Sequence, residues 1–450
     1  MKRKRFIQLS SFATAGGLVL PWSCNPRKQN PQQIRSVQKN WAGNYTYTAP
    51  HFHEPSSLEE VQELVRNLDE QKALGSAHCF NDIADSPSNQ ISTRRLNRLV
   101  EVDKENKTVT VEAGTRYGDF AEALHEQGYA LKNLASLPHI SVAGACATAT
   151  HGSGVRNGGL ATQVVAVELV KPDGSLVTID RSHPDFPAVV VGLGAFGIIT
   201  KVSLEIEETY DVLQHVFLDL PFDVAVTQFD EIMSSGYSVS YFTNWMDNKV
   251  SEVWVKRRAD DAGTELGGDF YGAKAATHNV HPVIEQSAES CSEQMGVPGP
   301  WYDRLPHFKM GFTPSTGAEL QAEYFVPREN AADALMAFEK MKEEIFPHMF
   351  ISEIRTVAAD NFWMSPCYKK ECVALHTTWK PKPKEVYALL PKIEAELAPY
   401  GVKPHWGKLF TLDAKVLQGR YEKHPEFLAL AKAYDPDGKF KNGYLTRNIY

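Results

Sequence analysis

The chain has 450 residues, of which 43% are hydrophobic and 23% charged, and its formal net charge is -8. This length and composition are typical of a globular protein with roughly two or three domains, and they exclude an intrinsically disordered chain. Beyond the first residues, lysine and arginine are scattered rather than clustered, so we expect no nucleic-acid partner.

The N-terminus predicts an export signal over residues 1–24. A basic start precedes an apolar run at residues 12–20, which is too short to span a bilayer. Residues 3–7 (RKRFI) are similar to a twin-arginine signal in which one arginine is replaced by lysine. Cys24 offers the alternative of a lipid anchor, although Pro21 stands where a lipoprotein signal usually has leucine. We therefore expect an exported protein that is periplasmic or associated with the cell envelope.

The first half of the mature chain alternates short strands with helices. Residues 57–60 (SLEE) form a capping box ahead of a run whose apolar residues share one helix face. Residues 99–112 predict a hairpin, residues 117–127 a helix, and residues 166–179 a second pair of strands joined by a Pro-Asp-Gly turn. This α+β pattern predicts one domain over residues 40–208.

A glycine-rich segment near the end of that domain fits a dinucleotide-binding fingerprint. Gly192, Gly194 and Gly197 follow the spacing G-x-G-x-x-G, which requires a helix directly after the glycines. Residues 199–206 instead alternate apolar and polar side chains, as a strand does. We therefore interpret the segment as a turn before a strand and not as a Rossmann site.

From Tyr210 onward the pattern changes to longer alternating strands, which predicts an antiparallel sheet domain over residues 209–400. A segment rich in glycine, proline and histidine at residues 263–312 is too long for an ordinary loop, and we expect a functional role for it. The clearest elements are strands at 240–245 and 250–255 and helices at 331–344 and 384–397.

Two loops of small residues come after strand-like segments. They are residues 75–82 (GSAHCFND) and residues 144–154 (GACATATHGSG). Small side chains let backbone N–H groups approach an anion closely, and the hydroxyls of Thr148, Thr150 and Ser153 add donors. The alternative is that both are tight turns of an ordinary α/β protein.

Three strand-like segments of the second half carry polar residues where a sheet usually has apolar ones. A period of two places Glu353 and Arg355 on one face, and His376 and Thr378 on another, while Lys408 lies among aromatic residues. Such groups must pair with each other or with a ligand when they are buried. The alternative is a structural Glu353–Arg355 ion pair beside a satisfied core histidine. The segments are 350–357, 373–379 and 404–410.

Motifs spread along the chain resemble the bacterial alditol oxidases, which belong to the vanillyl-alcohol oxidase and p-cresol methylhydroxylase superfamily and are related to the aldonolactone oxidoreductases. The similarity runs from about residue 40 to the C-terminus. It implies a two-part FAD-binding domain of the p-cresol methylhydroxylase type, an antiparallel-sheet substrate domain, and a segment 401–450 that returns to the FAD domain. The motifs are Trp41–Asn44, Leu134–Ser141, Cys291–Trp301, Glu353–Arg355, His405–Lys408 and Tyr434–Asn442.

The resemblance implies FAD as the cofactor, with a covalent bond from His78 to the C8α methyl group of the flavin. The alternative for His78 is an ordinary loop histidine bonded to a backbone carbonyl. A cysteine beside the loops, Cys79 or Cys146, supplies a second tether in some relatives, whereas a free cysteine is more often a small buried hydrophobe. The other implied cofactor-binding residues are Gly75, Ser76, Ala77, Cys79, Asn81, Ser136, Ser141, Gly144, Thr148, His151, Gly152, Gly154, Gly194, Gly197, Ile199 and His405.

The resemblance also implies a polyol bound above the flavin. Ser136, Glu353 and Thr378 would hold its hydroxyls, and Arg355, His376 and Lys408 would surround the reacting terminal hydroxyl. Among these, His376 has the intrinsic pKa best suited to accept a proton near neutrality, and Lys408 is its competitor. The expected reaction oxidises the alditol to an aldehyde and reduces molecular oxygen to peroxide.

Alternatives remain for both substrate and acceptor. The same site could take a sugar lactone or pass electrons to another acceptor, and Ala135 falls where relatives place a small residue that influences oxygen access. Two alternatives belong to a different functional class: a non-catalytic flavin or polyol binder, and a metal site built from His51, His53 and His278. The metal site has weak support, because a lone H-x-H is usually a surface strand feature. We expect a monomer with no bound metal.

Overall fold

The computed structural model describes residues 38–261, 266–312 and 318–450. Its contacts group Val37–Tyr450 as one unit, so the predicted domain boundaries within that unit stay predictions. The predicted export signal and Cys24 lie outside the described residues. Within the described ranges, no helix is both long and apolar enough to cross a membrane.

A small parallel sheet opens the fold and leads to the first loop of small residues. Its strand order is β1-β3-β2, and the helix α1 (Leu58–Asn67) connects β1 to β2. As the capping box predicts, the hydroxyl of Ser57 accepts from the backbone N–H of Glu60, but the carboxylate of Glu60 bonds Ser56 instead of Ser57. The strands are β1 (His51–His53), β2 (Gln71–Leu74) and β3 (Asn89–Ser92).

A five-stranded antiparallel sheet follows, in the order β4-β5-β9-β7-β8. Its strand β9 starts directly after Gly197, whose φ of +152° is unfavourable for other residues. Because a strand and not a helix follows the glycines, the interpretation that this is no Rossmann site is confirmed. The elements are β4 (Leu99–Asp103), β5 (Thr108–Glu112), β7 (Val164–Val170), β8 (Leu176–Asp180) and β9 (Ile198–Glu205), with α2 (Tyr117–Glu126), α3 (Val142–Ala147) and α4 (Phe186–Val189), and the short pair β6 (Tyr129–Ala130) and β10 (Glu207–Glu208).

The second half forms a ten-stranded sheet, which confirms the predicted change of pattern after Tyr210. Its order is β14-β15-β11-β13-β12-β18-β19-β17-β20, with β16 paired to β11, and the pairs are antiparallel. The strands are β11 (Asp211–Pro221), β12 (Ser238–Thr243), β13 (Lys249–Arg258), β14 (Asp269–Phe270), β15 (Ala273–Ala275), β16 (Gly299–Pro300), β17 (Leu320–Pro327), β18 (Met349–Val357), β19 (Cys372–Trp379) and β20 (Lys403–Pro404).

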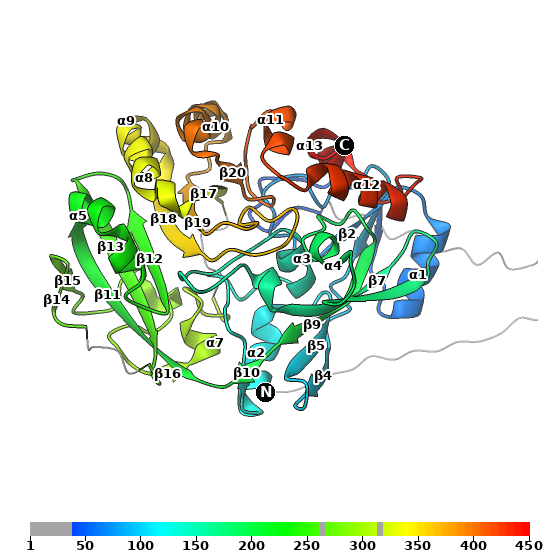
Figure 1. The fold of residues 1–450 in the computed structure, drawn as a ribbon, viewed down its shortest axis with the longest axis horizontal. Helices are drawn as coiled ribbons and strands as arrows, with labels where there is room; N and C mark the ends of the chain where they lie inside the picture. The colour runs from blue at the N-terminus through cyan, green and yellow to red at the C-terminus, as the bar shows by residue number, and fades with distance from the viewer. Residues whose placement is uncertain (1–37, 262–265, 313–317) are drawn as a thin grey trace, which may run out of the picture. The chain divides into compact units, whose positions relative to one another are not determined.

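Helices pack against one side of this sheet through a shared apolar core, and Figure 1 shows α8, α9 and α10 beside one another along it. The apolar residues of these helices and of the inner strands bury one another, which leaves the opposite side of the central strands for polar residues. The helices of this half are α5 (Phe222–Thr227), α6 (Phe229–Met233), α7 (Trp301–Arg304), α8 (Ala331–Lys340), α9 (Lys342–Ile345) and α10 (Pro383–Leu397).

Two predicted elements are wrong in their extent. The single helix expected over 331–344 is broken at Met341 into α8 and α9. The strand expected over 404–410 ends at Pro404, because the chain then turns: the backbone N–H groups of Gly407 and Lys408 bond to the ring and the carbonyl of His405. This turn carries Lys408.

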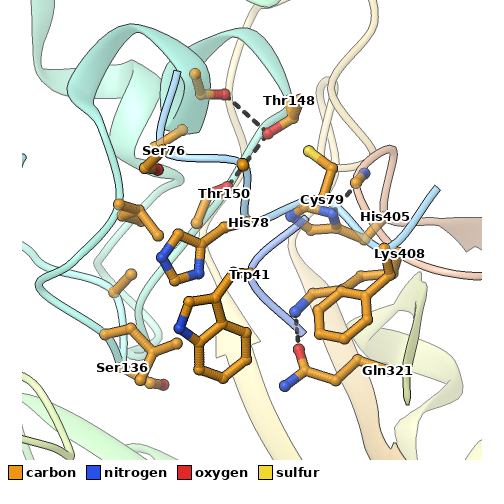
Figure 2. Close-up of a pocket in the computed structure, with 18 of the residues that line it drawn as sticks. Trp41, Ser76, His78, Cys79, Ser136, Thr148, Thr150, Gln321, His405 and Lys408 are labelled. Atoms are coloured by element: carbon orange, nitrogen blue, oxygen red, sulfur yellow. Dashed lines mark hydrogen bonds between the residues drawn. The ribbon is translucent and has the colours of Figure 1, made fainter. Parts of the chain in front are cut away.

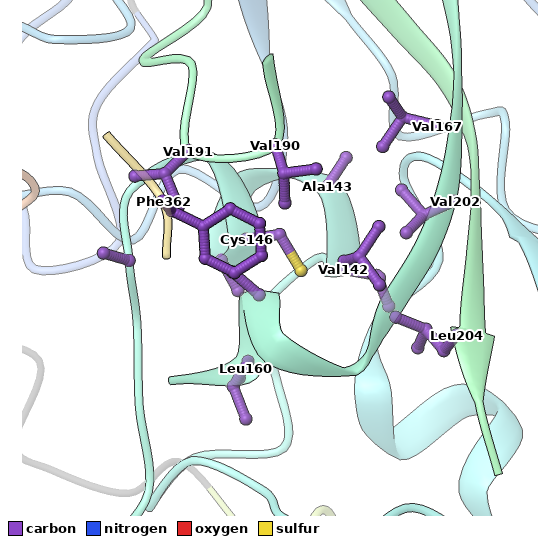
Figure 3. Close-up of a cluster of buried hydrophobic side chains, with 14 of the residues drawn as sticks. Val142, Ala143, Cys146, Leu160, Val167, Val190, Val191, Val202, Leu204 and Phe362 are labelled. Carbon is purple, nitrogen blue, oxygen red and sulfur yellow. The ribbon is translucent and has the colours of Figure 1, made fainter. Parts of the chain in front are cut away.

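The C-terminal segment packs against the first half of the chain. The ring of Phe427 lies 5.1 Å from that of Phe196, in a core that also contains most of α3 and the five-stranded sheet. Cys146 belongs to this core (Figure 3); its thiol lies 3.6 Å from the hydroxyl of Tyr117, and burial raises its pKa to about 12. The helices of the segment are α11 (Ala414–Gly419), α12 (His424–Tyr434) and α13 (Gly443–Asn448).

Candidate active site

One cavity of about 290 Å³ is lined by both loops of small residues and by the polar face of the ten-stranded sheet. The structure thus brings together residues that lie up to about 330 positions apart in sequence. The predicted site residues that line it are Gly75, Ser76, Ala77, His78, Cys79, Ser136, Ser141, Gly144, Thr148, His151, Gly194, Gly197, Ile199, Glu353, Arg355, His376, Thr378, His405 and Lys408.

Three predicted cofactor-binding residues do not line this cavity. The amide of Asn81 donates to the carbonyls of Trp406 and Lys408, at 2.8 Å each, and so holds the turn that carries Lys408. A side chain at Gly152 would place its Cβ 2.3 Å from the carbonyl of Leu134. Gly154 has a φ of +134° and would place a Cβ 2.4 Å from a backbone oxygen. Their role in cofactor binding stays a prediction, and within the described residues their contacts are with the backbone around the cavity.

The two loops of small residues lock onto each other at one end of the cavity. The hydroxyls of Ser76 and Ser141 each accept from the backbone N–H of the other residue, at 3.0 and 3.3 Å. A Cβ at Gly75 would lie 2.2 Å from the hydroxyl oxygen of Ser141, and Ala77 already has a φ of 60°. The small residues are therefore required for the close approach of the loops, and tight turns alone do not explain them.

Apolar residues continue this wall, together with a buried lysine, Lys72, that was not predicted from the sequence. Lys72 on β2 donates from Nζ to the carbonyls of Leu193, Gly194 and Phe440 at 2.9 to 3.3 Å. Burial lowers its pKa to about 7. A narrow wall of backbone amides, hydroxyls and apolar side chains without a free charge fits a large, flat cofactor with a diphosphate.

His78 stands at the junction of the loops and the substrate side. Its ring stacks on Trp41 at 5.1 Å between centroids and 19° between planes, and Figure 2 shows the two side by side. Burial and the nearby positive groups of His139, Lys408 and Arg116 lower the pKa of His78 to about 3. Its imidazole is therefore neutral at neutral pH. Burial raises the pKa of the neighbouring Cys79 thiol to about 11.

The polar face of the sheet is a row that crosses three strands. Glu323 on β17, His376 on β19 and Glu353 on β18 lie opposite one another in register. Arg355 sits one pleat further along β18, as the period of two predicts, and joins the row to the loops. Its guanidinium donates to Glu323 at 2.9 Å and to the hydroxyl of Ser136 at 3.0 Å, and its Nε lies 3.4 Å from Glu353.

Two buried histidines lie within hydrogen-bond distance of the carboxylates of this row. Nε2 of His151 lies 3.1 Å from Oε1 of Glu323, and Nε2 of His307 lies 2.7 Å from Oε1 of Glu353. Burial alone raises the pKa of a carboxyl group, but Arg355 and the histidines outweigh it and hold the pKa values of both glutamates well below their usual range. Both carboxylates are therefore ionised, and Arg355 is shared rather than bound in one isolated pair.

His376 does not have the pKa that its residue type predicts. Burial lowers it to about 3, although Glu323 and Glu353 oppose this shift, and its Nδ1 has no hydrogen-bond partner among the described residues. Burial lowers the pKa of His405 to about 3 as well. The expectation that His376 titrates near neutrality is therefore wrong.

Lys408 enters the same cavity from the turn after β20. Its Nζ donates to the side-chain oxygen of Gln321, as Figure 2 shows, and lies 4.9 Å from the centre of the Phe80 ring. Burial lowers its pKa, while Glu323 and Glu319 oppose the shift. A lysine with a lowered pKa is a candidate base as well as a cation.

The sequence analysis missed Gln321, Glu323 and His307. The first two alternate with apolar residues in Leu320–Phe325, so the signal that exposed Glu353 and Arg355 was present on β17 too. His307 lies outside any strand, and its contact with Glu353 depends on the tertiary fold alone. No spacing in the sequence indicates it.

The proposed histidine metal site has no support in the part of the chain that the structure covers. There, no group of three or more His, Cys, Asp or Glu residues is placed to hold a metal ion. His51 and His53 lie on β1, and Nε2 of His53 lies 3.0 Å from the side-chain oxygen of Asn89. This H-x-H pair is part of a small sheet.

Two known families match the chain, and each match covers residues of one half of the site. Residues 49–180 match the FAD binding domain family, and residues 307–448 match the D-arabinono-1,4-lactone oxidase family. Over 409 residues the chain is 45% identical to alditol oxidase from Streptomyces sp. (strain IKD472 / FERM P-14339), covering 90% of this chain and 97% of that protein. It is 26% identical to L-gulonolactone oxidase from Mus musculus and 26% identical to L-gulono-1,4-lactone dehydrogenase from Mycobacterium tuberculosis (strain ATCC 25618 / H37Rv), in each case over 98% of the relative and more than nine-tenths of this chain.

The fold itself has a counterpart among solved structures. Cholesterol oxidase from B. sterolicum superposes with a TM-score of 0.75 at 15% identity, covering 96% of this chain and 100% of that one. At this identity the likeness confirms the predicted α+β flavoprotein fold and nothing about the substrate. Together with the 45% identity over nearly the whole length, it shows that this chain belongs to the alditol oxidase family of FAD-dependent oxidoreductases.

Proposed function

We propose that this protein oxidises the terminal primary alcohol of an alditol of the xylitol or sorbitol type to the aldehyde, with reduction of oxygen to hydrogen peroxide. The observation that carries the proposal is the cluster around Arg355, which opens into the same cavity as the His78 loop. The 45% identity to an alditol oxidase supports it. A binder without turnover would gain nothing from ionised groups that cost several kcal/mol each to bury.

Each polar residue has a defined task in this reaction. Bound FAD supplies the acceptor for the hydride that leaves the alcohol carbon. Ser136, Glu353 and Thr378 line the cavity and present a hydroxyl or carboxylate to the hydroxyls of the polyol. Arg355 is held by Ser136 and Glu323 and needs no rearrangement to stabilise the charge that develops on the reacting oxygen.

We assign the proton transfer to Nζ of Lys408 and not to His376. A base must have a pKa near the working pH to be effective, and a pKa of about 3 makes the imidazole of His376 a weak acceptor. Burial lowers the pKa of Lys408 toward the range in which an amine can accept a proton. His376 then orients the substrate beside Glu323 and Glu353.

We propose that His78 forms the covalent bond to FAD. A neutral imidazole nitrogen can bond to the flavin, and the lowered pKa of His78 together with the Trp41 stack keeps the ring neutral and fixed. Precipitation of the purified protein in acid should leave the yellow colour in the pellet, and H78A should release it into the supernatant. Colour that leaves the wild-type pellet would remove the covalent bond and would leave FAD binding intact.

A second candidate is the oxidation of a sugar lactone, with oxygen or another electron acceptor. It is favoured by the match of residues 307–448 to D-arabinono-1,4-lactone oxidase and by relatives named as both an oxidase and a dehydrogenase of L-gulonolactone. Ala135 lines the cavity next to Ser136, where a small side chain leaves room for oxygen. Peroxide formation and dye reduction, each measured with an alditol and with a sugar lactone, separate the four combinations of substrate and electron acceptor.

We also propose export through the signal at residues 1–24, with lipid attachment at Cys24 as the alternative, and a monomeric state. The proposal rests on the sequence pattern of a basic start and a short apolar run. Fractionation of cells that express the wild type and C24S tests it: a protein in the soluble periplasmic fraction in both cases supports export without a lipid. Gel filtration of the purified protein tests the monomeric state.

A further inference from the structure

Lys256 is a buried cation that no step of the proposed reaction uses. It lies on β13 and is 0% exposed. Its Nζ lies 2.6 Å from the carbonyl oxygen of Leu305, 3.0 Å from that of Pro306 and 3.1 Å from Nδ1 of His307. No carboxylate among the described residues lies within ion-pair distance of it. Because burying an ammonium group without a counterion is costly, its presence requires an explanation.

The three contacts of Lys256 determine the tautomer of His307. Burial lowers the pKa of Lys256 to about 7, but the three acceptors around Nζ match the three protons of the ammonium form. An ammonium group has no acceptor, so Nδ1 of His307 accepts from it. The ring proton then lies on Nε2, which donates to Oε1 of Glu353 at 2.7 Å. The edges of Phe242 and Trp254 hold the ring, at 5.4 and 5.2 Å between centroids.

His307 joins two of the proposed substrate-binding residues. Its backbone N–H donates to the carbonyl of Ser136 at 3.0 Å, while its ring holds Glu353. Oε1 of Glu353 accepts from His307 and lies 3.4 Å from the Nε of Arg355, whereas Oε2 has no hydrogen bond from any described residue. Glu353 lines the cavity, so this second oxygen is left for a ligand.

We propose that Lys256 is a positioning residue for polyol binding, which acts through His307. It fixes the His307 tautomer, so that Oε1 of Glu353 is occupied and Oε2 accepts a hydroxyl of the polyol. This inference rests on the proposed function, because it takes the ligand of Glu353 to be a polyol. Lys256 itself contacts neither substrate nor cofactor.

The charged groups around this pair set the expected response to pH. Glu353 and Arg355 on β18 face His307, and Arg304 of α7 and Cys291 lie near Lys256. Without Lys256, one cation near the imidazole is lost while the carboxylate of Glu353 remains, so the pKa of His307 rises. At low pH the imidazolium still donates to Glu353. As the pH rises and the imidazolium of His307 loses a proton, nothing determines which ring nitrogen stays protonated, and the hydrogen bond to Glu353 is no longer assured.

The test uses the flavin-loaded holoenzyme, four single variants and one double variant. K256M removes the ammonium at similar volume, and K249M is the same change on the same strand at a half-exposed ion pair with Asp219. In H307Q an amide nitrogen, which has no tautomer, replaces the ring donor, and in H307L the donor is absent. Anaerobic mixing with xylitol at several concentrations gives the apparent Kd and the limiting rate of flavin bleaching between about pH 6 and 9.

We expect K256M to weaken xylitol binding about tenfold or more at high pH, with unchanged flavin content, and to regain affinity as the pH falls. K249M should behave as the wild type at every pH. The double variant K256M/H307Q should lose the dependence on pH. If K256M binds xylitol as K249M does, or weakens binding equally at all pH values, the proposal is wrong.

Two further readouts keep the proposal separate from folding and from the proposed function. If K256M does not retain flavin, the comparison of H307Q with H307L decides. The proposal is supported if H307Q binds xylitol nearly as well as the wild type and H307L binds it weakly. Equal xylitol affinity of the two variants overturns the proposal. If xylitol does not bleach the wild type, the proposed function fails, and thermal unfolding decides the tautomer. Lys256 contributes to the lowering of the His307 pKa to about 4, so its removal makes protonation of His307 less costly in the folded state. The Tm of K256M relative to K249M should then rise as the pH falls from 8 to 5, and more than the Tm of K256M/H307Q relative to H307Q. A constant difference would contradict it.

Discussion

The two walls of the cavity are built in opposite ways. The wall of the two loops consists of backbone, hydroxyls and small side chains, and a Cβ added at Gly75 would lie 2.2 Å from the hydroxyl oxygen of Ser141. The wall of the ten-stranded sheet consists of long charged side chains that are ionised and almost fully buried, with Arg355 between Glu323 and Glu353. We infer that the first wall is sensitive to added volume and the second to lost charge.

The largest effect should come from removing the central charge. R355M should lower the rate of flavin bleaching by alditol about a hundredfold or more, because we expect Arg355 to contribute about 3 kcal/mol of transition-state stabilisation. It also leaves Glu323 and Glu353 without their shared cation, so the Tm should fall. Rapid mixing of flavin-loaded protein measures the rate. R328M, which removes an exposed ion-pair partner of Asp230, is the control and should change neither quantity much.

Changes at Lys408 and His376 separate the two candidate bases. Because burial lowers the pKa of Lys408, the rate should rise with pH as its amine loses a proton. K408M should remove this rise and lower the rate about a hundredfold. H376A should keep the rise, since a group with a pKa of about 3 does not titrate in this range. A flat profile in H376A together with a preserved rise in K408M would return the role to His376.

The substrate wall could be predicted in part from sequence, for a physical reason. The period of two along a strand is local, so the shared faces of Glu353 with Arg355 and of His376 with Thr378 follow from the sequence alone. The partner of each charge is not local: Glu323 reaches Arg355 from a strand that is not adjacent, and His307 reaches Glu353 from outside the sheet. Burial is not local either, and it lowers the pKa of His376, which is why residue type alone gave the wrong pKa.

The loop wall was predictable in another way. Runs of glycine, alanine and serine indicate where backbone must approach closely, and the turn at Gly197 could be read because the alternation after it is that of a strand. Which small residue faces the cavity and which faces a neighbouring backbone is decided by the fold. Gly152 and Gly154 therefore look like Gly75 in sequence but pack elsewhere.

An added methyl group tests the loop wall. G75A should reduce FAD incorporation about tenfold, because its Cβ would collide with the hydroxyl of Ser141 and overpacking costs about 1–3 kcal/mol. The ratio of flavin to protein absorbance after purification measures it. G419A, where a Cβ meets nothing within 4 Å, is the matched control. Full flavin occupancy in G75A would show that the loops are not closely packed.

The smallest effect is expected at Cys79. Burial raises its pKa to about 11, so the thiol stays protonated and is a poor nucleophile. C79S should keep the acid-stable flavin and change the bleaching rate less than about threefold, which is under 1 kcal/mol. Loss of covalent flavin in C79S, with His78 intact, would instead establish a second tether on the loop wall.

We infer above all that an alditol bound at the charged wall reduces the flavin. Anaerobic rapid mixing of the wild-type holoenzyme with xylitol, followed by the absorbance of the flavin, tests it most directly. We expect xylitol to bleach the flavin in a saturable reaction that is faster than bleaching by L-gulono-1,4-lactone. Bleaching by the lactone alone, with a flavin that xylitol leaves oxidised, would contradict it.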